Sequence, residues 1–320
     1  PQLFTYTLVW MMILVFVGTL AQKDMGLFSV QNIYFSSWYF WWWYLPLPGG
    51  RFTMLLMFIN LSFFVFSKVL WKKDKLGILI LHLGGMLLMI GGGLTAVFST
   101  EGNMVIDEGR TSNYFEDYFN MELAVVNTTS LDYDDFFIFD KELLKVGKEL
   151  VYEGLPFNIE VLSILKNCKP VQRSAPSGVQ YKGMLKNFIL EDLPLLKEEE
   201  NNRPGIIFHL TNSGTSDDGV YGLFLGQAVP QNFEINGNTY TILYRKKRTY
   251  VPFEIELNDF KKVMHPGTGI AKSYSSDVNL IESGISKHIL ISMNQPLRHR
   301  GYTFYQSSFI ENIQGDTSVL

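Results

Sequence analysis

Residues 76–98 constrain the fold most. They form the apolar stretch LGILILHLGGMLLMIGGGLTAVF, which has no charged side chain. The hydrocarbon core of a bilayer is about 30 Å thick, and a helix needs about 20 predominantly apolar residues to cross it. The stretch is therefore predicted to span a membrane. It contains one histidine, His82, and several glycines, and both features need an explanation inside a membrane helix.

Two further apolar stretches precede it. Residues 3–22 are uncharged, and residues 52–71 carry Lys68 near their end, where its ammonium group can extend toward the interface. Residues 3–22 are too long and too aromatic for a typical signal-peptide core. We therefore predict an α+β membrane protein with three transmembrane helices in residues 1–98. A mostly-β extracytoplasmic domain follows in residues 99–320.

The distribution of lysine and arginine predicts the orientation. The link between the second and third spans reads KKDK (residues 72–75), whereas the loop between the first two spans offers only Lys23 and Arg51. Short cytoplasmic loops are enriched in positive charge. The link is therefore predicted to be cytoplasmic, and the domain after Phe98 external, which makes the protein multi-pass.

Residues 36–48, SSWYFWWWYLPLP, form an aromatic segment in the predicted outer loop. Tryptophan and tyrosine suit the headgroup layer of a membrane. The segment is predicted to be an interfacial helix that anchors the loop. The alternative is a surface that stacks on a flat aromatic ligand or partner.

Residues 99–320 carry short alternating patterns typical of strands. They occur at residues 156–164, 233–244, 252–260 and 301–309. Asn236-Gly237 lies between two alternating runs, which is a strong hairpin signal. The chain ends at Leu320 in a pattern typical of the middle of a strand, and no fourth apolar stretch follows. We therefore expect the chain to be truncated at this point, before a fourth span.

Composition excludes several functions. The net charge of −4 argues against nucleic-acid binding, and no phosphate loop or dinucleotide fingerprint is present. The single cysteine, Cys168, excludes an intrachain disulfide. No nucleophile–base motif is visible, so no catalytic residue is predicted. Four histidines outside the spans are each predicted to be a surface histidine or a structural one with its hydrogen bonds satisfied: His209, His265, His288 and His299.

His82 is the candidate site residue because ionisable side chains inside spans are functional candidates by default. Helical spacing places Gly85 and Met86 one turn after it, and Met89 two turns after it. Small residues permit close approach of a helix or a flat ligand, and a neutral imidazole can be an axial ligand of haem iron. The alternative is a histidine that hydrogen-bonds a neighbouring helix.

Four stretches together resemble the ResB/CcsB family of cytochrome c biogenesis proteins, and most of all the CcsB-like half of fused bacterial CcsBA proteins. They are residues 26–40 (GLFSVQNIYFSSWYF), 81–98, 251–280 and 291–309 (ISMNQPLRHRGYTFYQSSF). They run in the family's order and cover both halves of the chain.

The resemblance implies a part in system II cytochrome c maturation in the bacterial inner membrane, with the large domain in the periplasm. It implies a lyase-type holocytochrome c synthase complex in which this chain is not catalytic on its own. The cargo would be haem b, with His82 as its axial ligand through the iron and Gly85, Met86 and Met89 lining the pocket. The implied partners are a CcsA-like protein or fused half, apocytochrome c and membrane lipid, with no nucleic acid.

The sequence is compatible with two other functions. The chain could be a non-catalytic, membrane-anchored scaffold whose outer domain only docks a partner. It could also assist the transport of another apolar cofactor. A haem-handling subunit needs His82, whereas a scaffold should tolerate phenylalanine or glutamine at that position.

Overall fold

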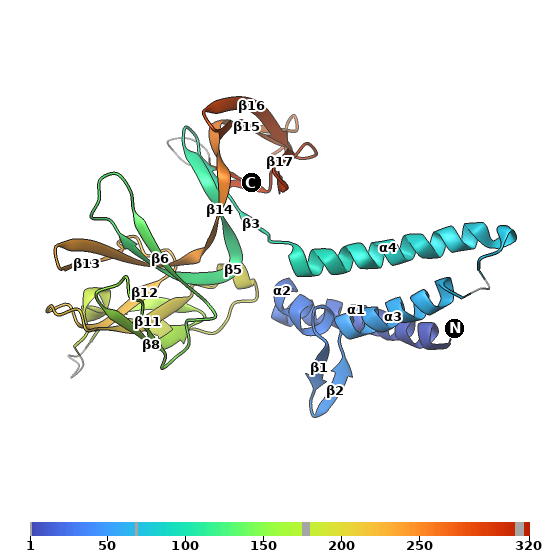
Figure 1. The fold of residues 1–320 in the computed structure, drawn as a ribbon, viewed down its shortest axis with the longest axis horizontal. Helices are drawn as coiled ribbons and strands as arrows, with labels where there is room; N and C mark the ends of the chain where they lie inside the picture. Colours follow the sequence, from blue (N-terminus) through green and yellow to red (C-terminus); the bar gives the residue numbers. More distant parts are fainter. Residues whose placement is uncertain (1, 68–69, 175–179, 311–316) are drawn as a thin grey trace. The chain divides into compact units, whose positions relative to one another are not determined.

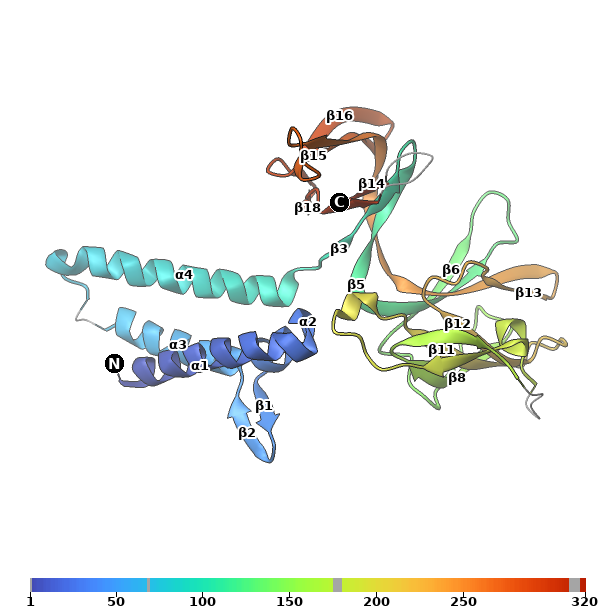
Figure 2. The same ribbon diagram turned by 180° about the vertical axis from the view of Figure 1, so that it is seen from behind.

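The computed structural model describes residues 2–67, 70–174, 180–310 and 317–320. The chain divides into two compact units. The helical unit comprises residues 1–100 together with residues 192–203, and the β unit comprises residues 101–191 and 204–320. Figures 1 and 2 show the elements of each unit from opposite sides.

The helical unit is built on three main helices, α1, α3 and α4, which run alongside one another in both views (Figures 1 and 2). Its helices are α1 (Gln2–Met25), α2 (Leu27–Val30), η1 (Gln31–Phe35), α3 (Gly50–Val65), η2 (Lys73–Lys75) and α4 (Leu76–Phe98). In the described part of the chain, two helices are long and apolar enough to cross a membrane, namely Gln2–Met25 and Lys73–Phe98.

The helix at the second predicted span is shorter than expected. The prediction placed it at residues 52–71, but α3 is 16 residues long, or about 24 Å at 1.5 Å per residue. It ends because side chains satisfy its last carbonyl groups: Ser67 Oγ donates to Phe64 at 2.6 Å, and Trp71 Nε1 donates to Val65 at 2.9 Å. Residues 68–69 lie outside the described residues. A three-span topology is thus not confirmed.

The aromatic segment forms a β-hairpin, so the prediction of an interfacial helix was wrong. Strands β1 (Tyr39–Trp42) and β2 (Leu45–Pro48) pair in an antiparallel ladder, and the hairpin extends sideways from the helices (Figures 1 and 2). Prolines 46 and 48 lack an N–H donor and oppose a helix, whereas aromatic residues favour strands. Trp10 Nε1 donates to the Pro48 carbonyl at 2.9 Å and ties the hairpin to α1.

Residues 192–203 group with the helices, although they come from the middle of the β-rich sequence. The segment contains η4 (Glu199–Asn201), and the Ser29 hydroxyl donates to Glu199 Oε2 at 3.4 Å. Gly26 has a positive φ of 77°, and a Cβ atom there would clash with the carbonyl oxygen of Lys197. Only glycine therefore fits this contact.

The β unit is built almost entirely from antiparallel strands. The strands up to residue 211 are β3 (Gly102–Asn103), β4 (Val105–Asp107), β5 (Thr111–Asn127), β6 (Asp135–Asp140), β7 (Glu149–Leu150), β8 (Asn158–Leu165), β9 (Cys168–Gln172), β10 (Phe188–Asp192) and β11 (Gly205–Thr211). Those that follow are β12 (Gly219–Phe224), β13 (Gln231–Ile235), β14 (Asn238–Met264), β15 (Ala271–Glu282), β16 (Ile285–Ser292), β17 (Leu297–His299), β18 (Tyr302–Phe304), β19 (Ser308–Ile310) and β20 (Thr317–Val319). A short 3-10 turn, η3, covers Gly183–Lys186.

Two long strands, β5 and β14, link two lobes of the β unit (Figure 1). β14 is 27 residues long and pairs with β5 along residues 240–256. Its first residues pair with β13, and its last residues pair with β15 on the same edge. β5 and β14 are therefore part of both lobes.

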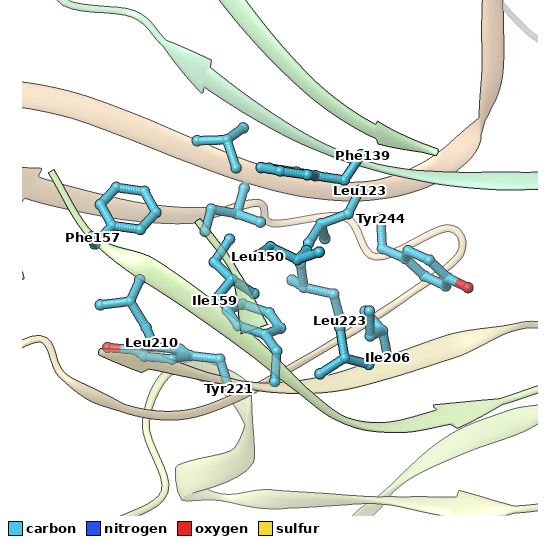
Figure 3. Close-up of a cluster of buried hydrophobic side chains, with 14 of the residues drawn as sticks. Leu123, Phe139, Leu150, Phe157, Ile159, Ile206, Leu210, Tyr221, Leu223 and Tyr244 are labelled. Atoms are coloured by element: carbon cyan, nitrogen blue, oxygen red, sulfur yellow. The ribbon is translucent and has the colours of Figure 1, made fainter. Parts of the chain in front are cut away.

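Each lobe has its own apolar core. The first core contains Phe157, Ile159, Phe208 and Leu210, which are all at most 1% exposed. Figure 3 shows Phe157, Ile159 and Leu210 with other members of this core. The second core forms around the distal half of β14 and includes Phe253. The two cores are separate because each lobe buries its own apolar faces.

Candidate functional site

Helices α3 and α4 pack through a small apolar cluster. Leu79 and Met86 of α4 are buried against Phe58, Leu61 and Val65 of α3. Leu79 and Met86 are two turns apart, so they lie on the same face of α4. The face of α4 that carries Leu79 and Met86 therefore points toward α3.

His82 lies on α4 between these two contacts. Its ring is half-buried and sits against Phe64 of α3, with 5.1 Å between the ring centroids and an interplanar angle of 56°. Its Nδ1 atom lies 2.7 Å from the carbonyl oxygen of Ile78. A carbonyl oxygen can only accept, so Nδ1 must carry the proton. In the neutral ring, the lone pair then resides on Nε2, which is the state of a metal-binding histidine.

The glycines of α4 differ in their surroundings. A Cβ atom on Gly85 would meet Leu61 at 3.8 Å, an ordinary contact distance. The other five glycines would meet nothing within 4 Å among the described residues: Gly77, Gly84, Gly91, Gly92 and Gly93. Most of the glycines of α4 therefore do not serve the close packing of α4 against another part of the described chain.

An apolar pocket of about 550 Å³ lies between the first half of α3 and the second half of α4. Its lining includes Trp38, Arg51, Phe58, Met89 and Gly93. Ligand pockets commonly have volumes of about 300–1,000 Å³. The four predicted site residues are thus separated: Met89 lines the pocket, Met86 and Gly85 face α3, and His82 lies outside the lining. Their role toward haem stays a prediction.

Sequence reasoning did not find Arg51 and Trp38 as pocket residues. Arg51 was treated only as a topology signal, and Trp38 as part of the aromatic segment. Arg51 forms no ion pair among the described residues, so it is a cationic group beside an otherwise apolar space. The available signal was the unusual placement of an arginine at the start of an apolar helix.

Three of the histidines in the β unit contact carboxylates. The closest His209–Glu160 atoms are 3.9 Å apart, His288–Asp277 atoms 2.6 Å, and His299–Glu282 atoms 2.9 Å. His265 follows β14 in a turn, where its backbone amide donates to Ile270. No group of three or more potential metal ligands occurs within the described ranges.

Cys168 is buried in β9 and is 2% exposed. It packs in an apolar cluster with Leu185 and Leu190. Lys166 and Lys169 flank it in the sequence, and nearby cations can lower the pKa of a thiol, but reactive cysteines are partly exposed. The burial favours a packing role.

Comparison with known proteins supports the family resemblance. Residues 227–319 match the ResB-like family, a region that runs from just before β13 to β20. Over 320 residues the chain is 22% identical to Protein NrfI of Wolinella succinogenes, covering 99% of this chain and 31% of that protein. The chain thus spans less than a third of that relative's length. The predicted ResB-type resemblance is confirmed.

Proposed function

Starting from this family match, we propose that the chain is the CcsB-like part of a system II cytochrome c synthase. It would take up haem b in the membrane as cargo, move it outward and support its covalent attachment to the CxxCH motif of apocytochrome c. The family match supports a role in cytochrome c biogenesis. Because the chain spans only part of its relative, a CcsA-like protein or fused half would complete the assembly and supply the catalytic groups.

The proposal includes a three-span topology in the bacterial inner membrane. α1 and α4 are long enough to cross, and α3 would complete the crossing with the residues that flank it. Basic residues at positions 72, 73 and 75 favour a cytoplasmic position for η2. The β unit would then be periplasmic.

The hydrogen bond between His82 Nδ1 and the Ile78 carbonyl oxygen is the observation that carries the proposal. Because Nδ1 donates to the carbonyl oxygen of Ile78, Nε2 carries the lone pair and is the atom that can bind a metal. In metal-binding histidines, a hydrogen bond of this kind also fixes the tautomer and the orientation of the ring. A neutral imidazole avoids the large penalty of a charge in the hydrocarbon region. Haem iron commonly takes a histidine ligand, and iron would accept Nε2 here.

The pocket supports outward transfer along α4. At 1.5 Å per residue, His82 lies about 9 Å from Leu76, which places it in the cytoplasmic half under the proposed topology. The pocket lining on α4 begins at Leu88 and ends at Val97, in the outer half. Apolar space therefore lies on the side toward which an apolar cargo would move.

Replacing His82 with glycine in the complete membrane complex tests the proposal. The His82→Gly variant should co-purify with about tenfold less haem and should show an altered visible absorption spectrum, because one axial ligand is lost. Added imidazole should restore part of the haem content by occupying the vacated ligand position. His265→Gly, a change of the same chemistry at an exposed site of the β unit, is the matched control and should behave as wild type.

Two results would favour other functions. Normal haem content and an unchanged spectrum in a folded His82→Gly complex would show that His82 packs against Phe64 and does not bind iron. Full cytochrome assembly with phenylalanine at position 82 would favour the scaffold function. In that case the outer domain would act by docking a partner.

A further inference from the structure

One edge of β14 lacks a partner strand over its middle section. On that edge, the pairing with β13 ends at Ile242 and the pairing with β15 begins at Glu254. The opposite edge pairs with β5 over residues 240–250, across a bulge near Lys247, and again at residues 255–256. In the described part of the β unit, residues 243–253 therefore have no strand on one side. Such an edge presents unpaired backbone donors and acceptors.

A pocket of about 250 Å³ lies beside this unpaired edge. One wall is β14 itself, from Ile242 to Lys246, together with Arg248 and its ion-pair partner Glu116 on β5. The other wall is the end of β12 and the turn after it, which includes Gly226, Gln227 and Pro230. The space lies beside β14 just beyond the point where its pairing with β13 ends.

The wall formed by β14 is basic: residues 245–248 read RKKR, and Arg245, Lys246 and Arg248 line the pocket. Three of the four cations are paired: Arg245 with Glu122 at 2.8 Å, Lys247 with Asp140 at 2.9 Å and Arg248 with Glu116 at 3.0 Å. Lys246 is half-buried, lines the pocket and forms no ion pair among the described residues. The pocket therefore has an excess of positive charge.

Two buried polar atoms on lining residues also lack hydrogen-bond partners in the described chain: Arg245 Nη2 and Gln227 Oε1. One is a donor and the other an acceptor. Buried groups without partners are uncommon, since each loses its hydrogen bonds to water. A ligand that offers both donors and acceptors would suit this pocket better than a simple anion.

We propose that the pocket is a docking site for an extended peptide with acidic side chains, which adds as a strand to the free edge of β14. Backbone hydrogen bonds to residues 243–248 would supply the pairing, and a carboxylate would pair with Lys246. When a peptide adds as a strand, its main-chain hydrogen bonds provide affinity and its side-chain contacts provide specificity. The site lies wholly within the β unit, so the proposal is independent of haem binding by His82.

Fluorescence anisotropy with a labelled peptide tests the charge requirement. The probe is an eight-residue peptide of alternating glutamate and valine, added to the full chain in lipid nanodiscs. It should bind, and a peptide of alternating lysine and valine should bind at least about tenfold more weakly, because close charge pairs contribute to such interfaces. Equal binding of the two peptides would overturn the proposal.

N-methylated peptides test strand addition directly. In a strand, the N–H groups of alternate residues point to the same edge, so methylating every valine blocks one edge and methylating every glutamate blocks the other. A peptide that adds to β14 uses one edge only. One methylated form should therefore lose binding while the other keeps it. Equal affinities for both forms would exclude strand addition.

The Lys246→Glu variant tests whether the peptide binds at this pocket. It should weaken binding of the acidic peptide by about tenfold, and the lysine peptide should gain affinity. Lys287→Glu makes the same charge change at an exposed position on β16 and should leave both affinities unchanged. If both variants weaken binding equally, the attraction is a general charge effect and the docking site is refuted. Circular dichroism confirms that each variant is folded.

Discussion

Arg245 Nε donates a 2.8 Å hydrogen bond to Glu122 Oε1, and the two residues are direct partners across strands β14 and β5. The Glu122 side chain is 2% exposed and that of Arg245 10% exposed. Removing one partner of a buried ion pair leaves an uncompensated charge. Glu122→Gln is therefore expected to lower the free energy of unfolding of the β unit by about 3–5 kcal/mol.

The ion pair between Arg248 and Glu116 is the matched control. It has similar geometry, but its side chains are 25% and 27% exposed. Glu116→Gln should destabilise by less than about 1 kcal/mol, because water replaces the lost contact. All six tryptophans precede residue 72, so unfolding of the β unit is best followed by far-UV circular dichroism. Equal losses in the two variants would contradict the role of burial.

Phe157 anchors the first core (Figure 3). It is 1% exposed and meets Tyr240 edge-on, with 5.4 Å between the ring centroids. Phe157→Ala should lower the free energy of unfolding by about 3–5 kcal/mol, since it removes buried apolar area and leaves a cavity. Phe188→Ala removes the same atoms at a position that is 39% exposed and should have a much smaller effect. Similar midpoints for the two variants in urea denaturation would disprove this prediction.

Asp277 is expected to make the stability of the second lobe depend on pH in the acid range. A hydrogen bond from Asn258, followed by one from His288, holds the pKa of this carboxyl below its ordinary value of 3.8. Because the folded-state pKa is lowered, the contribution to stability is complete above about pH 4 and is lost as the pH falls through the folded value. Melting temperatures of wild type and Asp277→Asn should therefore converge between pH 5 and pH 2, to within about 1 °C. A difference that does not change with pH would show that the charge of Asp277 makes no contribution.

Local sequence signals predicted the β unit well where turn chemistry is strong. Asn236 and Gly237 have φ values of 56° and 79°, and they form the two-residue turn between β13 and β14 as predicted. The alternating patterns at residues 156–164 and 252–260 lie in β8 and β14. These signals succeed because they depend on neighbouring residues only.

Features that depend on distant contacts were missed. The sequence shows two separate alternating patterns, at residues 233–244 and 252–260. In the structure, the basic residues between the two patterns also belong to β14, because they lie where β14 pairs with β5. The predicted strand at residues 301–309 is divided between β18 and β19, which pair with different strands. Partner choice of this kind is not encoded in a local pattern.

The candidate site shows the same division. His82 was found because an ionisable residue in an apolar span is conspicuous. Its contact with Phe64 and the pocket near Met89 were not predictable, because they depend on the packing of α3 against α4. Spacing along one helix shows which residues share a face, but not which face a neighbouring helix covers.

The aromatic hairpin is expected to lie in the headgroup layer. Trp41, Trp42 and Trp43 are 63%, 67% and 88% exposed, which is unusual for large aromatic residues unless another phase covers them. Lipids brominated near the headgroup should quench tryptophan fluorescence more strongly than lipids brominated near the chain ends. Replacing these three tryptophans with phenylalanine should abolish most of that difference. No preference between the two lipids would contradict an interfacial position.

The crossing by α3 decides between two and three spans. A periplasmic phosphatase reporter can be inserted at Tyr44 in the hairpin, at Asp74 in η2 and at Leu131 in an exposed loop of the β unit. If α3 crosses, the reporter should be active at Tyr44, inactive at Asp74 and active at Leu131, because the basic residues around Asp74 favour the cytoplasm. If α3 does not cross, Tyr44 and Asp74 must give the same activity. A helix of 16 residues is shorter than the usual span, so the hydrocarbon layer would have to thin or the flanking residues extend toward the interface.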